Sequence, residues 1–207
     1  MIKRLGILGS GKGSNFAAIA DAVQNKTLKA EIALVLSDIE NAGILALANK
    51  HGIPHRYIAP GKFRTKIEPE IEMEWVRLLQ EARVDLVVLA GFMRILKPPF
   101  LSAFEKRVMN IHPSLLPVFP GLEAWKQALD YGVRYTGCTV HLVTPETDAG
   151  PIILQAIVPV LPQDTSETLH ARIQEQEPPL YVEAIRLWCE NRLRIQDRRI
   201  QILPVKC

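Results

Sequence analysis

Short apolar runs alternate with longer amphipathic segments along most of the chain. Buried strands of a parallel sheet read as short apolar runs, whereas a covering helix repeats its apolar positions every three or four residues. The alternation therefore predicts a doubly wound, mostly parallel, open α/β sheet in a single domain. The expected strands are Arg4–Leu8, Ile32–Leu36, His55–Ile58, Leu86–Leu89, Val108–Ile111, Thr139–Val143 and Ile152–Pro159. The expected helices are Asn15–Gln24, Ile44–His51, Glu68–Glu81, Glu123–Tyr131 and Ser166–Cys189.

Capping residues and a change of composition set the expected boundaries. Ser14-Asn15 is expected to cap the first helix, and Ser166-Glu167 the last. Beyond Asn191, arginines alternate with apolar residues. We therefore expect one catalytic domain over residues 1–191, followed by a basic C-terminal tail or edge hairpin over residues 192–207.

Composition excludes several classes of protein. The 207 residues are 48% hydrophobic and 23% charged, as in globular domains. A net charge of +3, spread along the chain, is too small for a nucleic-acid surface. No apolar run approaches the roughly 18 residues of a membrane helix. Three widely spaced cysteines fit neither a disulfide framework nor a zinc site, so we expect a cytoplasmic protein without a metal.

A glycine-rich turn, residues 9–15, joins the first strand to the first helix. Such a turn favours a phosphate because helix N–H groups converge there. Gly13 stands where a Walker A loop needs Ser or Thr, so triphosphate hydrolysis is disfavoured. A dinucleotide fingerprint with Asp38 as the ribose ligand lacks its third glycine. A phosphate monoester is the better ligand, and a turn that binds nothing remains the alternative.

Asn110 and His112 stand two residues apart at the end of a strand, so both side chains should project from one face. A strand's carboxyl end is where open α/β sheets bind ligands. An amide and an imidazolium together could stabilise the oxyanion of an acyl or formyl transfer. If the polar loop that carries Asp148 folds over His112, its carboxylate would keep the imidazole protonated; a plain turn residue is the alternative.

Two further groups of residues allow either a purely structural or a functional interpretation. Residues Met93, Arg94, Ile95 and Leu96 follow a strand and could line the pocket of a flat aromatic ligand, or simply pack in the core. The remaining histidines lack metal-ligand spacing and default to solvent or core roles. They are His51, His55, His141 and His170.

Four motifs in the same order resemble the phosphoribosylglycinamide formyltransferases of purine biosynthesis, over about residues 5–193. They are Gly9-Ser10-Gly11-Lys12-Gly13-Ser14-Asn15, Ala90-Gly91-Phe92-Met93-Arg94-Ile95-Leu96, Asn110-Ile111-His112-Pro113-Ser114-Leu115-Leu116-Pro117 and Asp148-Ala149-Gly150-Pro151. The resemblance implies formyl transfer from 10-formyltetrahydrofolate to the amine of 5′-phosphoribosylglycinamide. These two small molecules would be the only partners, in a monomer or homodimer.

The resemblance also assigns residue roles. His112 would be the catalytic acid/base, Asp148 would keep it protonated, and Asn110 would orient the formyl oxygen. Phosphoribosylglycinamide would be bound by Gly13, Ser14, Asn15 and Glu177. The folate would be bound by Met93, Arg94, Ile95, Leu96, Asn110, Thr144 and Thr147.

Two departures from the family pattern and three alternatives complete the expectations. Pro178 replaces a family histidine and suggests that the last helix breaks there, and Lys66 replaces a family arginine. The related methionyl-tRNA formyltransferase and formyltetrahydrofolate deformylase carry further domains, which would leave this chain too short for either. A non-catalytic dinucleotide-binding module would explain only the glycine turn.

Overall fold

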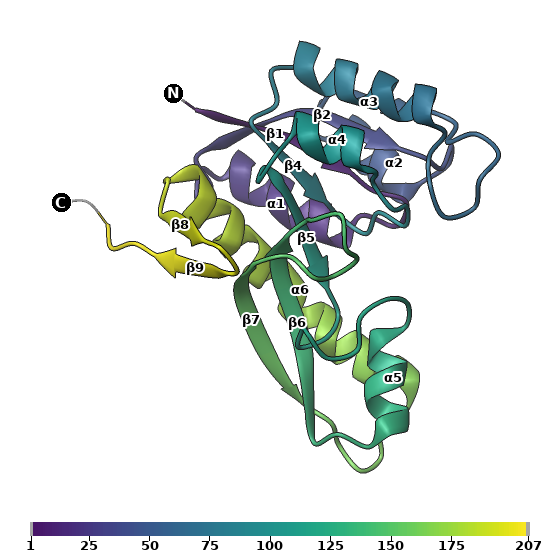
Figure 1. The fold of residues 1–207 in the computed structure, drawn as a ribbon, viewed down its shortest axis with the longest axis vertical. Coiled ribbons are helices and arrows are strands. Elements are labelled where there is room, and N and C mark those ends of the chain that lie inside the picture. The colour runs from purple at the N-terminus through teal and green to yellow at the C-terminus, as the bar shows by residue number, and fades with distance from the viewer. Residues whose placement is uncertain (1, 206–207) are drawn as a thin grey trace. The chain divides into compact units, whose positions relative to one another are not determined.

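The protein is described here by a computed structural model that covers residues 2–205 (Figure 1). The chain divides into two compact units, residues 1–109 and 110–207.

The first unit is a parallel α/β layer. Its strands are β1 Lys3–Leu8, β2 Ala30–Ser37, β3 His55–Tyr57 and β4 Leu86–Leu89. Its helices are α1 Ser14–Gln24, α2 Gly43–Lys50, α3 Pro69–Glu81 and α4 Pro98–Ala103. β1 pairs in parallel with β2 and with β4, and β2 with β3. Figure 1 shows α1 and α2 on one face of this layer and α3 and α4 on the other, so the central strands are covered on both sides.

Burial explains why these segments became strands. All four residues of β4 are buried, as are the last four of β1. Trp75 of α3 is fully buried and packs against Phe92, with ring centroids 5.5 Å apart. The loops that follow β1, β2 and β4 are therefore attached to well-packed strands. The carboxyl ends of such strands are where this fold class binds ligands.

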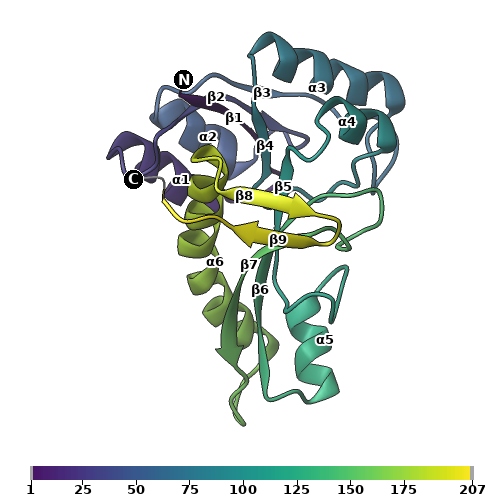
Figure 2. The same cartoon turned by 60° about the vertical axis from the view of Figure 1, so that its left-hand side comes forward.

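The second unit combines strands, two helices and a terminal hairpin. Its elements are β5 Val108–His112, which begins in the last two residues of the first unit, α5 Ala124–Tyr131, β6 Tyr135–Leu142, β7 Ile152–Pro159, α6 Ser166–Cys189, β8 Leu193–Gln196 and β9 Arg199–Ile202. β6 and β7 pair in antiparallel fashion, and α6 lies along them (Figure 2).

The seven strands form one sheet in the order β3-β2-β1-β4-β5-β6-β7, so the predicted open, mostly parallel α/β sheet is confirmed. β8 and β9 form a separate two-stranded sheet. The division into a catalytic domain 1–191 and a tail 192–207 stays a prediction.

Several predicted boundaries were wrong. β6 begins at Tyr135, four residues before the predicted Thr139, and ends before Val143. The helix α4 was not predicted, because it is only six residues long and opens with two prolines, which are tolerated in a first turn.

The residues that cap the first and last helices also differ from those predicted. Gly13, with a left-handed φ of 84°, precedes the first helix, and Ser14 is already helical. The last helix is capped by Thr165, which forms a reciprocal capping box with Thr168.

The expected break at Pro178 was wrong as well. α6 continues through Pro178 and Pro179 to Cys189. A proline inside a helix removes one backbone hydrogen bond. Buried residues on both sides, Ile173 and Tyr181 among them, keep the helix in place by packing.

Candidate active site

Asn110 and His112 lie at the carboxyl end of β5, on the same face of the strand. His112 is buried, with 5% of its surface exposed, and Asn110 is half-buried. A buried polar side chain needs partners, because its unpaired groups would lose their hydrogen bonds to water. The contacts of His112 therefore define the site.

Both ring nitrogens of His112 face oxygen atoms. Nδ1 lies 3.4 Å from Asp148 Oδ2, and Nε2 lies 2.9 Å from the carbonyl oxygen of Phe119. An imidazole whose two nitrogens both face acceptors is arranged as the doubly protonated, cationic form, because only that form donates from both. The geometry suits a residue that delivers a proton.

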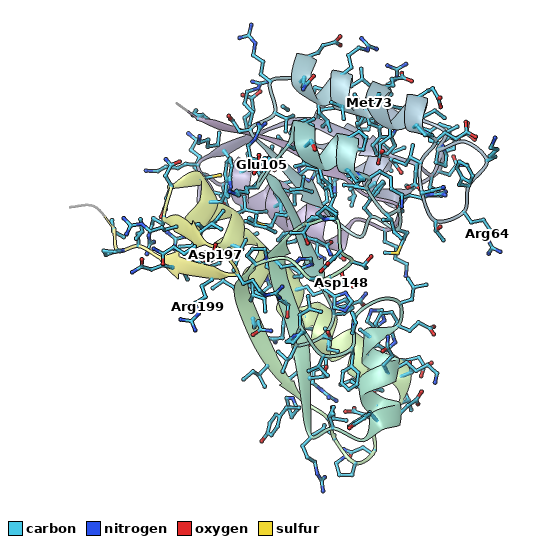
Figure 3. All side chains as sticks on the ribbon, in the orientation of Figure 1. Arg64, Met73, Glu105, Asp148, Asp197 and Arg199 are labelled. Carbon is cyan, nitrogen blue, oxygen red and sulfur yellow. The ribbon has the colours of Figure 1, made fainter. Side chains whose placement is uncertain are left out.

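Asp148 lies on the loop that joins β6 to β7 (Figure 3). Its side chain is 10% exposed, its φ is +52°, and its Oδ2 accepts the N–H of Gly121 at 2.8 Å. Two residues on, Gly150 approaches β6 so closely that a Cβ would lie 1.7 Å from the oxygen of Leu142. The glycine therefore permits the close return of the loop that carries Asp148.

His141 is a functional candidate that sequence reasoning missed. It was assigned to a solvent or core role, yet its Nε2 lies 3.3 Å from Asn110 Nδ2 and 3.8 Å from Asp148 Oδ1. Its Nδ1 lies 3.1 Å from the oxygen of Leu142. Burial, as the largest effect, lowers the pKa of His141 below its ordinary value.

The contacts of His141 fit a neutral ring. With Nδ1 donating to Leu142, Nε2 is the free acceptor and receives one amide proton of Asn110. The second amide proton of Asn110 remains for another acceptor. His141 thus fixes the orientation of the Asn110 amide.

The glycine turn of the first unit has the geometry expected of an anion site. Gly13 is buried and left-handed, and a Cβ there would come within 3.0 Å of Ile44 Cα. Ser14 is exposed and Asn15 is buried in the first turn of α1, whose leading N–H groups have no partner within the helix.

The Asp38 side chain, considered as a ribose ligand, is 1% exposed and forms an ion pair with Arg94, from Nε to Oδ2 at 2.7 Å. Arg94, expected to line a ligand pocket, directs its guanidinium to protein groups. Of its neighbours, Met93 and Ile95 are 64% and 43% exposed, whereas Leu96 is 5% exposed. Met93 and Ile95 are therefore available to a ligand, and Leu96 packs in the core.

The remaining predicted residues lie in the second unit. Thr147 is exposed, and Thr144 Oγ is bonded to the oxygen of Glu146. Glu177 was expected near the start of a helical segment, but it lies in the middle of α6 and is 8% exposed. Burial and the negative charge of Glu177 raise the pKa of the Cys138 thiol to about 12, so this thiol stays protonated and unreactive.

Within residues 2–205, no group of three or more His, Cys, Asp or Glu side chains could hold a metal ion. In the same part of the chain, no helix is both long and apolar enough to cross a membrane.

A half-buried amide and a buried imidazole at the end of an α/β strand, with a second imidazole and a loop carboxylate beside them, define the class of an acid–base transfer enzyme. Residues 3–185 match the formyl transferase family, and the chain belongs to that family.

Relatives and solved structures agree with this assignment. The chain is 39% identical to a phosphoribosylglycinamide formyltransferase of Haemophilus influenzae over 95% of its own length and 92% of that protein. It is 46% identical to a trifunctional purine biosynthetic protein adenosine-3 of Drosophila pseudoobscura pseudoobscura, of which it spans only 14%. The crystal structure of glycinamide ribonucleotide transformylase 1 from Symbiobacterium toebii superposes with a TM-score of 0.94, at 46% identity and over 98% and 95% of the two chains.

A formyltetrahydrofolate deformylase from Pseudomonas syringae is more distant in sequence. It shares 29% identity, with a TM-score of 0.90 over 99% of this chain and 67% of the deformylase. The fold is therefore shared with a formyltetrahydrofolate deformylase, so the fold alone does not decide which molecule accepts the formyl group.

Proposed function

We propose that the protein transfers the formyl group of 10-formyltetrahydrofolate to the amine of 5′-phosphoribosylglycinamide, in the purine pathway named in its relatives. The observation that carries the proposal is the cluster of Asn110, His112 and Asp148, with His141 beside it. A formyl acceptor with a phosphate group also fits the turn at Gly13 and Ser14.

The chemistry follows from charge development. The amine nitrogen attacks the formyl carbon, and the carbonyl oxygen becomes an oxyanion in a tetrahedral intermediate. The free amide proton of Asn110 stabilises that oxygen, and the Nε2 proton of His112 does so once it leaves the carbonyl oxygen of Phe119. The bond from carbon to N10 then breaks, the attacking nitrogen loses a proton and N10 gains one, with His112 as acid/base and Asp148 supporting its cationic form.

The first unit supplies groups for binding. The first-turn amides of α1 and the side chains of Ser14 and Asn15 would hold the phosphate monoester. The exposed side chains of Met93 and Ile95 would contact the pterin, and the backbone of Arg94 and Leu96 would offer polar groups for its edge. Thr144, Thr147 and Glu177 would complete the folate and amine contacts.

The test is release of tetrahydrofolate from 10-formyltetrahydrofolate, followed spectroscopically with and without phosphoribosylglycinamide. We expect release only when the amine is present. Asp148→Asn should lower kcat by about 10² to 10³-fold, because the support for the cationic imidazole is lost. Asp130→Asn is the matched control, since Asp130 is 60% exposed and pairs with Lys126 within α5.

Other outcomes would overturn the proposal. Release without the amine would identify a deformylase, and no release at all would reject formyl transfer. The dinucleotide-binding alternative predicts fluorescence changes on titration with NAD(P); the internal pairing of Asp38 argues against it. Location in the cytoplasm and a monomeric or homodimeric state stay predictions.

A further inference from the structure

A buried carboxylate lies at the carboxyl end of the first unit's sheet, just after β2. The side chain of Asp38 is 1% exposed. Its Oδ1 accepts the hydroxyl of Ser10 at 2.6 Å, and its Oδ2 accepts Nε of Arg94 at 2.7 Å. The three residues come from the loops that follow β1, β2 and β4, so a single carboxylate connects three strand ends.

The loops after β1 and β4 are bound to each other at two more points. The N–H of Met93 donates to Ser10 Oγ at 3.0 Å, and the N–H of Ser10 donates to the oxygen of Gly91 at 3.1 Å. Ser10 is therefore both a donor to Asp38 and an acceptor for Met93. Its hydroxyl transmits the position of the carboxylate to the backbone of residues 91–96.

Arg94 extends the same network to the loop between β3 and α3. Its Nη1 donates to the carbonyl oxygens of Phe63 and Arg64, and its side chain is 12% exposed. Arg64 itself lies at the outer part of that loop (Figure 3). Ile95 adds a parallel bridge to Lys66, so residues 63–66 are held against residues 94–95 by backbone and side chain together.

A buried ion pair is a poor device for stability alone. Removing two charges from water costs about as much as their attraction returns, and a well-packed apolar pair often does better. The same pair strongly fixes geometry, because each oxygen and each N–H must keep its partner once it is buried. A role in geometry is therefore the more informative explanation of Asp38.

We propose that Asp38 is a positioning residue that sets the glycine turn, residues 9–15, and the segment of residues 91–96 in one fixed relation. This inference rests on the proposed function, in which the turn binds the phosphate and the segment binds the pterin. One carboxylate then controls the affinity for both substrates, although it contacts neither. It acts through Ser10 on one side and through Arg94 on the other.

The kinetic test compares KM and kcat for both substrates in Asp38→Asn and the wild type. The amide keeps the volume but has no charge and a single acceptor oxygen, so its NH2 group would face one of the two donors, Ser10 Oγ or Arg94 Nε. We expect KM to rise about tenfold for both substrates, with kcat changed less than about threefold, because binding and not the transfer step is affected. Arg94→Lys should raise the KM of the folate alone, because the ammonium keeps the charge but cannot also reach the two carbonyls.

The matched control is Asp85→Asn. Asp85 directly precedes β4, at the amino end of the strand, whereas Asp38 follows the carboxyl end of β2. Asp85 Oδ2 accepts the N–H of Arg4 at 2.8 Å, at the amino ends of β1 and β4 rather than at the ends that carry the two loops. We expect this variant to lose stability without a change in either KM. If Asp38→Asn also lowers only the melting temperature, or raises only one KM, the proposed coupling is wrong.

Hydrogen exchange separates failure of this inference from failure of the proposed function. In Asp38→Asn, the amides of Ser10 and Met93 should exchange faster than in the wild type, whereas Asp85→Asn should leave them unchanged. This measurement needs no substrate. Unchanged exchange at both amides in Asp38→Asn would overturn the inference even in an active enzyme.

Discussion

Asp148 places one carboxylate oxygen 3.4 Å from His112 Nδ1 and the other 3.8 Å from His141 Nε2. Two imidazoles therefore share one carboxylate. They differ in state, because burial lowers the pKa of His141 and its Nε2 faces the Asn110 amide as an acceptor. The negative charge of Asp148 is thus available to His112.

The contact between His141 Nε2 and the Asn110 amide predicts a specific effect of replacing His141. His141→Leu removes the acceptor that orients Asn110, and we expect kcat to fall about tenfold with KM nearly unchanged, because the lost interaction acts in the transition state. His141→Gln offers an oxygen acceptor and should recover part of the rate. Steady-state kinetics near neutral pH measure both variants.

The pH profile gives an independent readout of His141. Below its lowered pKa, the ring gains a proton, stops accepting from Asn110 and competes with His112 for Asp148, so activity should fall on the acidic side of the ordinary histidine range. His141→Gln has no such proton to gain and should lose this acidic decline. An unchanged acidic limb in that variant would show that His141 does not act on the site.

Gly150 offers a test of the loop that carries Asp148. In Gly150→Ala the new Cβ would meet the oxygen of Leu142, so the loop must move. We expect kcat to fall by at least about tenfold, since a displacement of about 1 Å at a reacting group is enough for such a loss. Asp130→Asn is the control, because Asp130 is 60% exposed and pairs with Lys126 within α5. Wild-type kcat in Gly150→Ala would contradict this account of the loop.

Asp164 predicts a pH-dependent contribution to stability. Its carboxylate is 2% exposed and receives both Nη1 and Nη2 of Arg172, which holds its pKa well below the usual range. A carboxyl group with a depressed folded-state pKa stabilises above its unfolded pKa, near 4, and loses that contribution as the pH falls further. Asp164→Asn should therefore lower the melting temperature at pH 7 by about 3–6 °C.

Calorimetry over a pH series measures this effect. The difference between wild type and Asp164→Asn should shrink as the pH falls below about 4. Asp130→Asn, which disrupts an exposed pair, should leave the melting temperature nearly unchanged. A difference that stays constant from neutral pH down to about pH 2.5 would refute the assigned ion pair.

Local pattern was enough for the parts of the fold that are uniformly buried. Leu86–Leu89 was predicted with its observed bounds, because all four residues are buried, Asp85 precedes them and Ala90-Gly91 follow them. Tyr135 was missed as the start of β6, because Tyr135-Thr136-Gly137 carries no apolar run and is paired by the distant β7. Pairing across the chain, rather than local preference, decides such a boundary.

The part of the site that lies on a single strand was also predicted from the sequence. Asn110 and His112 are two residues apart, so a strand alone places them together. The contacts of His141 and the pairing of Asp38 with Arg94 depend on loops that bring side chains together across the fold. Nothing in the alternating pattern around His141 distinguishes it from a core residue, and 56 positions separate Asp38 from Arg94.

The amide and the imidazole of the site stand on a strand, whereas the carboxylate stands on a loop. Loops open locally at a lower free energy than the strands of a core. On warming, Asp148 should leave His112 before the sheet melts, so the enzyme would lose its activity while still folded. Its working temperature would then be set by a few residues of the loop between β6 and β7, and strengthening that loop would extend the range more than strengthening the core.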